Sequence, residues 1–171
     1  MVNVRSILMR ANRRMGAALV ENNLVDISDL EMANEKLLEF AKQGINRRSS
    51  VLGLLVWEMN SLEEKDLIEL QVEQHKLPPI ELANVEPEEG LVKDLDPALC
   101  WATWTVPFDE VDGYFFVATC YYLSSAVRQF WEEHLRGPII WYVTPMSQLA
   151  DTIDWMQKEF ARPEVVQGSG G

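Results

Sequence analysis

Two stretches of the sequence share one pattern and decide the fold: RMGAALVENNLVDISDL at residues 14–30 and VLGLLVWEMNSLEEKDL at residues 51–67. The matching pairs are Gly16 with Gly53, Glu21 with Glu58, Asn23 with Asn60, Asp29 with Asp66, and Leu30 with Leu67. In each copy a short apolar segment reaches an Asn, a residue that can end a helix in the left-handed conformation, and an amphipathic helix follows. An internal repeat of this kind predicts two helical hairpins of one design in tandem.

Each hairpin is expected to join a short helix, at residues 15–22 or 51–59, to a long one. For the first long helix, Asp26 or Ser28 is expected to provide the cap, and for the second Ser61 provides it. The residues expected to face inward are Leu30, Ala33, Leu37, Phe40 and Ala41 in the first long helix, and Leu67, Leu70 and Gln74 in the second.

The second half of the chain has a different pattern. Prolines and an acidic stretch at residues 86–89 interrupt any helix after residue 75. Residues 101–107 and 114–119 are rich in aromatic and β-branched side chains and flank a turn sequence, which predicts a β-hairpin. A helix that opens at Ser124 or Ser125 and runs to residue 135, a strand at 139–143 and a helix from Ser147 complete a ββαβα order.

We therefore predict an α+β fold with N-terminal tandem helical hairpins followed by a small ββαβα sheet-and-helix subdomain. The expected segments are an N-terminal arm or short helix at 1–13, the tandem helical-hairpin repeat at 14–75, a connecting segment at 76–99, the ββαβα subdomain at 100–161 and a flexible tail at 162–171.

Charge is also distributed unevenly along the chain. The 171 residues carry a net charge of −12; residues 1–48 hold 8 basic and 6 acidic side chains, whereas residues 49–171 hold 7 and 21. Because binding to nucleic acids depends on neutralising phosphates, this composition argues against a nucleic-acid partner. It also argues against an anionic membrane surface, and no apolar run is long enough to span a bilayer.

Reactive side chains are few. Cys100 and Cys120 are expected to be buried free thiols rather than a cross-strand disulfide, which matches a reducing, cytoplasmic setting. His75 and His134 are isolated, so no metal site is expected. The sequence contains no phosphate-binding Gly-rich motif of the P-loop type. We therefore expect no catalytic residues and no enzyme activity, although a hydrolase or transferase with an unrecognised site, marked by a deep pocket, is the alternative.

The repeat resembles the tandem motif of the N-terminal domain of type II secretion and type IV pilus assembly ATPases, the GspE/PilB class. In its cyclic-di-GMP-binding form this domain is called MshEN. The motif runs Arg-Leu-Gly, two residues, Leu-Val, two residues, Gly, six residues, Leu, three residues, Leu, two residues, Gln. The resemblance covers residues 14 to about 160 and includes the order of the later strands and helices.

Each copy matches this motif only in part. The first copy supplies Arg14 but has Leu37 where the motif has Gln. The second copy supplies Gln74 but has Val51 where the motif has Arg, for which Arg47 or Arg48 is a possible substitute. The resemblance implies a cyclic-di-GMP site in which the Arg serves a guanine or phosphate, Gly allows close approach and Leu packs on the bases. The residues of such a site are Arg14, Met15, Gly16, Leu30, Leu52, Gly53, Leu67 and Gln74.

Two readings of these residues stay open. In the first they are hairpin scaffold, and the chain is a non-catalytic regulatory or protein-docking domain with no cofactor. Its partner would be a protein of a bacterial secretion, pilus or related envelope assembly, and it would lie in the cytoplasm or, through that partner, at the inner face of the inner membrane. In the second reading the chain is a cyclic-di-GMP sensor. The six tryptophans are expected to be mostly core, the alternative being an aromatic surface for a partner.

Overall fold

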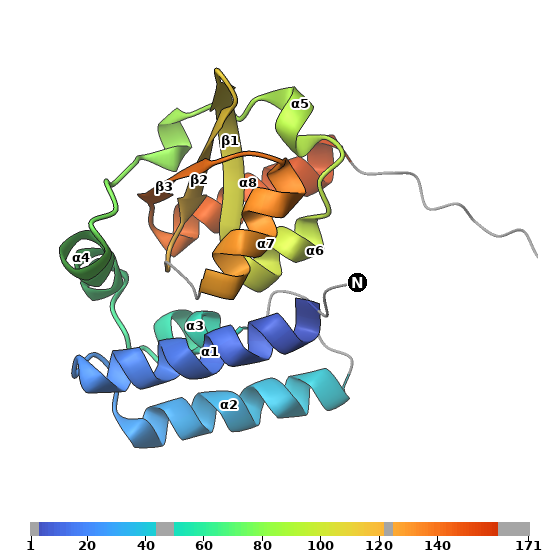
Figure 1. Ribbon diagram of the computed structural model, residues 1–171. Coiled ribbons are helices and arrows are strands. Elements are labelled where there is room, and N and C mark those ends of the chain that lie inside the picture. Colours follow the sequence, from blue (N-terminus) through green and yellow to red (C-terminus); the bar gives the residue numbers. More distant parts are fainter. Residues whose placement is uncertain (1–3, 44–49, 122–124, 161–171) are drawn as a thin grey trace, which may run out of the picture.

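Helices fill the N-terminal half of the molecule, and a small sheet with its own helices forms the second half (Figure 1). The computed structural model describes residues 4–43, 50–121 and 125–160. Within them the chain has the α+β architecture expected from the sequence, with helical hairpins first and a three-strand mixed sheet after them. The tail expected at 162–171 and the Arg47 and Arg48 positions lie outside the described residues.

The first hairpin consists of α1 (Val4–Glu21) and α2 (Ile27–Lys42). The expectation of a short helix beginning at residue 15 is wrong, because α1 begins at Val4. Ala11, Met15 and Leu19 follow one another at four-residue spacing and are all buried, so the apolar stripe extends the helix toward the N-terminus. In α2 the expected inward face is largely confirmed, with Ala33 fully buried, but Ala41 is exposed near the helix end.

Each hairpin turns at an asparagine, as expected. Asn23 has φ 56° and Asn60 has φ 52°, so both adopt the left-handed conformation. This conformation costs most side chains about 1 kcal/mol or more, and Asn is among the few residues that tolerate it. The repeat seen in the sequence is therefore also a repeat of the backbone conformation at the two turns.

The second hairpin begins with α3 (Val51–Gly53), which passes directly into η1 (Leu54–Glu58), a turn of π-helix. Residues 51–56 are all buried, so this segment is surrounded by protein rather than lying on its surface. It leads to α4 (Glu64–His75), where Leu67 and Leu70 face inward as expected. Gln74 does not: Gln71 is the buried residue, and Gln74 lies exposed in the last turn beyond the core.

The expected helix caps are confirmed only in part. Asp26 occupies the N-cap of α2 but makes no side-chain cap hydrogen bond, and Ser28 lies inside the helix. Glu63, not Ser61, occupies the N-cap of α4. Both long helices thus depend on the burial of their apolar faces rather than on side-chain caps.

The connecting segment contains three short helical elements, η2 (Leu82–Asn84), α5 (Glu89–Val92) and α6 (Pro97–Thr103). The strand expected at 101–107 is therefore wrong at its start, since residues 101–103 belong to α6. Pro97 at the first helical position and Asp96, whose carboxylate accepts a 2.9 Å hydrogen bond from Ala98 N, set this helix in place. Trp101 then packs toward α8 (Met146–Glu159), donating to Gln157 Oε1 at 3.2 Å.

The sheet has the order β1 (Thr105–Val111), β2 (Tyr114–Thr119), β3 (Ile139–Val143). β1 and β2 are antiparallel and meet at Asp112 and Gly113, which both have positive φ as a two-residue hairpin turn requires. β2 and β3 are parallel and are joined through α7 (Ser125–Leu135). α8 crosses one face of the strands, and its Leu149, Ile153 and Met156 are buried.

Most of the tryptophans and both cysteines lie in the core, as expected. Trp101, Trp104, Trp131 and Trp141 are buried, whereas Trp57 and Trp155 are 45% and 37% exposed. Cys100 and Cys120 are buried free thiols. None of the helices in the described part of the chain combines the length and the apolarity needed to cross a bilayer.

Candidate ligand site on the helical repeat

In the first copy of the repeat, the exposed side chain of Arg14 lies next to a tightly packed turn of α1. Arg14 is exposed on α1, and within the described residues no hydrogen bond or ion pair is assigned to it. Met15 and Gly16, the next two motif residues, are buried. A Cβ at Gly16 would lie 2.9 Å from Cδ2 of Leu30 on α2, so the glycine allows α1 and α2 to approach closely.

In the second copy, the corresponding residues are enclosed. Leu52 and Leu67 are buried, and Val51, which stands where the motif has Arg, is only 2% exposed. The backbone N–H of Gly53 donates a 3.0 Å hydrogen bond to Ser50 Oγ, the N-cap of α3. This N–H is therefore already satisfied by the chain itself.

Gln74 joins the two copies. Its Nε2 donates to Oδ1 of Asn22 at 2.5 Å, which connects the end of α4 to the end of α1. Asn22 directly follows α1. Arg14 lies on α1 eight residues earlier, a separation of about 12 Å along the helix axis. The two exposed polar residues of the motif thus reach the same helix about two turns apart.

The structure therefore divides the eight predicted residues into two groups. Arg14 and Gln74 are exposed, and Leu30 is half-buried. Met15, Gly16, Leu52, Gly53 and Leu67 are buried. Of these eight residues, only Arg14 and Gln74 have exposed polar groups, a guanidinium and an amide, and a planar ligand would need side-chain movement to reach the enclosed leucines.

An ion pair also ties the copies together. Lys36 Nζ on α2 lies 3.3 Å from Glu58 Oε1 on η1. Both side chains are more than a third exposed, so the pair adds little stability but orients the two copies. Together with the contact between Gln74 and Asn22, it makes one unit of the two hairpins.

Groups that could carry out chemistry are scarce in the described residues. No cluster of three or more His, Cys, Asp or Glu suited to a metal ion occurs within them. Burial raises the pKa of Cys100 to about 12, and burial raises the pKa of Cys120 further, so neither thiol ionises near neutral pH. Burial, followed by the charge of Arg128, lowers the pKa of His75. These shifts reflect burial and packing, and the groups do not converge on a pocket.

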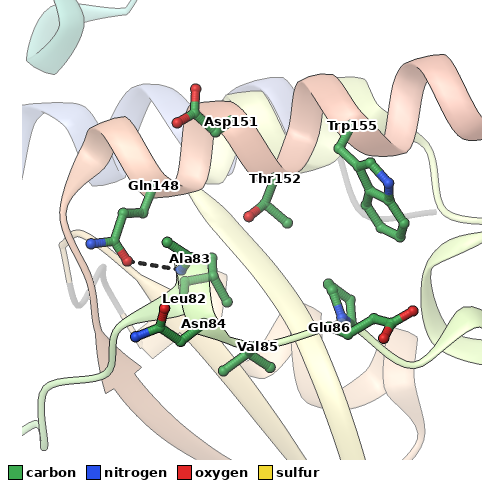
Figure 2. A pocket seen from close by; sticks show the side chains of 10 residues that line it. Leu82, Ala83, Asn84, Val85, Glu86, Gln148, Asp151, Thr152 and Trp155 are labelled. Carbon is green, nitrogen blue, oxygen red and sulfur yellow. Dashed lines mark hydrogen bonds between the residues drawn. The ribbon is translucent and has the colours of Figure 1, made fainter.

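Two adjoining hollows occur elsewhere, beside α8 in the sheet half. Figure 2 shows the residues that line the larger of them. The two hollows have volumes of about 600 Å³ and 430 Å³ and share Glu86, Pro87 and Trp155. We call them together the α8 groove. Sequence reasoning did not find this groove. The acidic stretch at 86–89 was visible in the sequence, but only tertiary packing places it opposite Trp155.

The similarity of this chain to known proteins is one of fold. No protein-family profile matches the chain, and no curated protein matches its sequence. Among solved structures, the N-terminal domain of XpsE aligns over 84% of this chain and 95% of its own length, with 21% identity and a TM-score of 0.53. A second crystal form of XpsE aligns over 90% and 96%, with 19% identity and a TM-score of 0.50. MshE, solved with cdg, aligns over 82% and 96%, with 20% identity and a TM-score of 0.50. This likeness over most of the chain confirms the fold expected from the repeat.

Proposed function

We propose that this chain is a non-catalytic regulatory or docking domain that acts through contact with another protein. The observation that carries the proposal is the state of the second copy of the repeat. Val51 is buried where a ligand-binding Arg would stand, and the N–H of Gly53 is bonded to Ser50. A dinucleotide with two similar halves needs two similar half-sites, and within the described residues the motif position that carries Arg14 in the first copy carries the buried Val51 in the second.

The fold supports the same proposal. It is shared with the N-terminal domain of XpsE, and the resemblance of the repeat to the secretion and pilus ATPase class points to a partner in a bacterial secretion, pilus or related envelope assembly. An acidic surface favours a protein partner over a nucleic acid. Its place in the cell would then be the cytoplasm, at the inner membrane when the partner is bound.

The test is direct binding between the purified full chain and the soluble domains of secretion and pilus assembly proteins encoded in the same genome. We expect at least one of them to bind with a dissociation constant in the micromolar range or below. An acidic helical domain of similar size and charge serves as the control. Absence of binding to every member of the set would contradict the proposal.

The second candidate is a cyclic-di-GMP sensor, favoured by one observation. Arg14 is exposed beside the Gly16 and Leu30 contact, so the first copy retains the polar group and the packing of the motif. The structure of MshE with cdg has the same fold. In this candidate, Arg14 and Gln74 would provide the polar contacts to the ligand.

Calorimetric titration with cyclic-di-GMP separates the two candidates. For a docking domain we expect no binding up to about 100 μM ligand in the wild type. Arg14→Ala is the informative variant and Arg10→Ala, an exposed Arg one turn earlier on α1, is its matched control. Micromolar binding that Arg14→Ala abolishes and Arg10→Ala retains would establish the sensor instead.

A further inference from the structure

The α8 groove lies between two segments that are distant in sequence. One wall is α8, which contributes Gln148, Asp151, Thr152 and Trp155, and the other is the chain from Leu82 to Glu89. In Figure 2, Trp155 extends from α8 toward the side of the groove where Glu86 lies. The groove belongs to the sheet half and contains none of the eight motif residues.

The lining of the groove is strongly acidic. The carboxylates are Glu86, Glu88, Glu89, Asp151 and Glu159. Among the described residues, none of those that line the two hollows is a Lys or an Arg. Lys93 and Lys158 lie nearby in the sequence and are exposed, but they do not line the groove. Like charges gathered along one concave surface favour a cationic occupant and repel an anionic one.

An aromatic surface lies among these carboxylates. Trp155 is 37% exposed and belongs to both hollows, and Phe160 packs against it edge to face with ring centroids 5.7 Å apart. An indole face attracts a cation through its quadrupole, and a guanidinium can stack on it while its N–H groups reach a carboxylate. This combination distinguishes the groove from an ordinary solvated acidic surface.

The walls of the groove are fixed to each other. Gln148 Oε1 accepts a 3.0 Å hydrogen bond from Ala83 N, and Gln148 Nε2 donates to Glu81 Oε2 at 2.8 Å. Glu88 N donates to Phe108 O at 3.0 Å, which attaches the far end of this wall to the edge of β1. A groove held open by the fold loses little entropy when an occupant binds.

We propose that the α8 groove binds a short arginine-containing segment of a protein partner. This inference rests on the proposed docking function and adds to it the chemistry of the contact. The guanidinium would stack on Trp155, and the carboxylates on both walls would neutralise its charge and that of neighbouring cations. The volumes of the two hollows suit a few side chains of an extended or helical segment.

The test uses the full chain and a fluorescein-labelled tetra-arginine peptide, followed by fluorescence anisotropy at about 50 mM salt. Tetra-lysine is the comparison peptide, since it has the same charge without the planar group. We expect tetra-arginine to bind at least threefold more tightly than tetra-lysine. We also expect Trp155→Ala to weaken tetra-arginine binding about fivefold and to remove that preference.

The charge requirement is tested with the double variant Glu86→Gln, Glu159→Gln. We expect it to weaken the binding of both peptides by about fivefold. The matched control is Glu132→Gln, Glu133→Gln, which removes two exposed carboxylates from α7 outside the groove. All four residues are exposed, so the variants should keep the circular dichroism spectrum and melting temperature of the wild type.

Three results would overturn the inference. The first is equal weakening by the groove and control variants, since binding would then follow net charge alone. The second is tetra-arginine binding as tight as that of the wild type both in Trp155→Ala and, separately, in the Glu86→Gln, Glu159→Gln double variant. The third is self-association of the chain that the same double variant abolishes, because the occupant would then be a second copy.

Failure of the groove inference and failure of the docking proposal give different results. If an assembly protein binds the chain equally well in wild type and groove variants, docking stands and the groove inference fails. If tetra-arginine shows the expected behaviour but no assembly protein binds, the groove binds cationic segments and the proposed partner class is wrong.

Discussion

The indole Nε1 of Trp104 donates a 3.0 Å hydrogen bond to Ser50 Oγ. Ser50 is the N-cap of α3, at the start of the second copy of the repeat, and Trp104 directly precedes β1. This contact therefore connects the helical repeat to the sheet half. The same hydroxyl oxygen accepts the Gly53 N–H. Trp104 also has φ 50°, a left-handed conformation that is rare for a large side chain and that the surrounding contacts must maintain.

We predict that Ser50→Ala destabilises the chain by about 2 kcal/mol, because it removes a helix cap and leaves a buried indole N–H without its partner. Ser61→Ala is the matched control, since Ser61 precedes α4 but does not cap it, and should change stability by less than about 0.5 kcal/mol. Urea denaturation measures both. Similar effects at the two serines would show that the bond from Trp104 does not stabilise the fold.

The contact between Gly16 and Leu30 gives a second prediction. Because a Cβ at Gly16 would lie 2.9 Å from Leu30 Cδ2, we expect Gly16→Val to cost about 1–3 kcal/mol. In a double-mutant cycle, adding Leu30→Ala should recover part of that loss. Gly90→Ala, at a helical glycine with no atom within 4 Å of its Cβ position, should leave stability unchanged or raise it. If the stability losses from Gly16→Val and Leu30→Ala simply added in the double variant, that result would contradict the close approach of α1 and α2.

The paired asparagine turns give a third prediction. At φ near 50°, Asn60→Gly should preserve stability within a few tenths of a kcal/mol, whereas Asn60→Ala should cost about 1 kcal/mol. Asn23 should behave in the same way, since its φ is 56°. Thermal and urea unfolding of the four variants provide the measurement. An alanine variant as stable as the glycine variant would argue against the left-handed turn at that position.

The thiols give a fourth prediction. Since burial raises the pKa of Cys100 to about 12 and raises the pKa of Cys120 as well, both stay protonated from pH 7 to pH 9. We expect negligible reaction with Ellman's reagent in the native state and no increase across this range, whereas an exposed thiol would become more reactive as its ordinary pKa is passed. In guanidinium chloride both thiols should react. Failure to react after unfolding would indicate a disulfide.

Much of the fold follows from local pattern. The repeat, the two left-handed asparagines and the hairpin at Asp112 and Gly113 depend on residues close in sequence, so spacing and turn chemistry were enough to predict them. The errors have physical causes too. Residues 101–103 have the aromatic and β-branched character of a strand, but the cap at Asp96 and Pro97 and the burial of Trp101 extend a helix through them.

The sequence identifies the residues of the candidate site, but it does not predict the contacts that these residues make. The motif residues could be identified from their spacing, but spacing does not reveal that Gly53 bonds to Ser50 or that Gln74 bonds to Asn22. The contact between Gln74 and Asn22 joins the end of α4 to the end of α1 and exists only once the helices have packed. Packing also decides which glutamine of α4 is buried. Gln71 is buried, whereas the spacing of the apolar residues predicted Gln74.

The sequence by itself determined the class of fold, the repeated hairpins and the unequal distribution of charge, because each depends on local periodicity or composition. Only the tertiary structure decided which motif residues remain exposed and that the acidic stretch at 86–89 faces Trp155 of α8. The physical reason is distance along the chain: a groove with walls about 60 residues apart forms when long-range packing brings those walls together, and no local pattern encodes that contact.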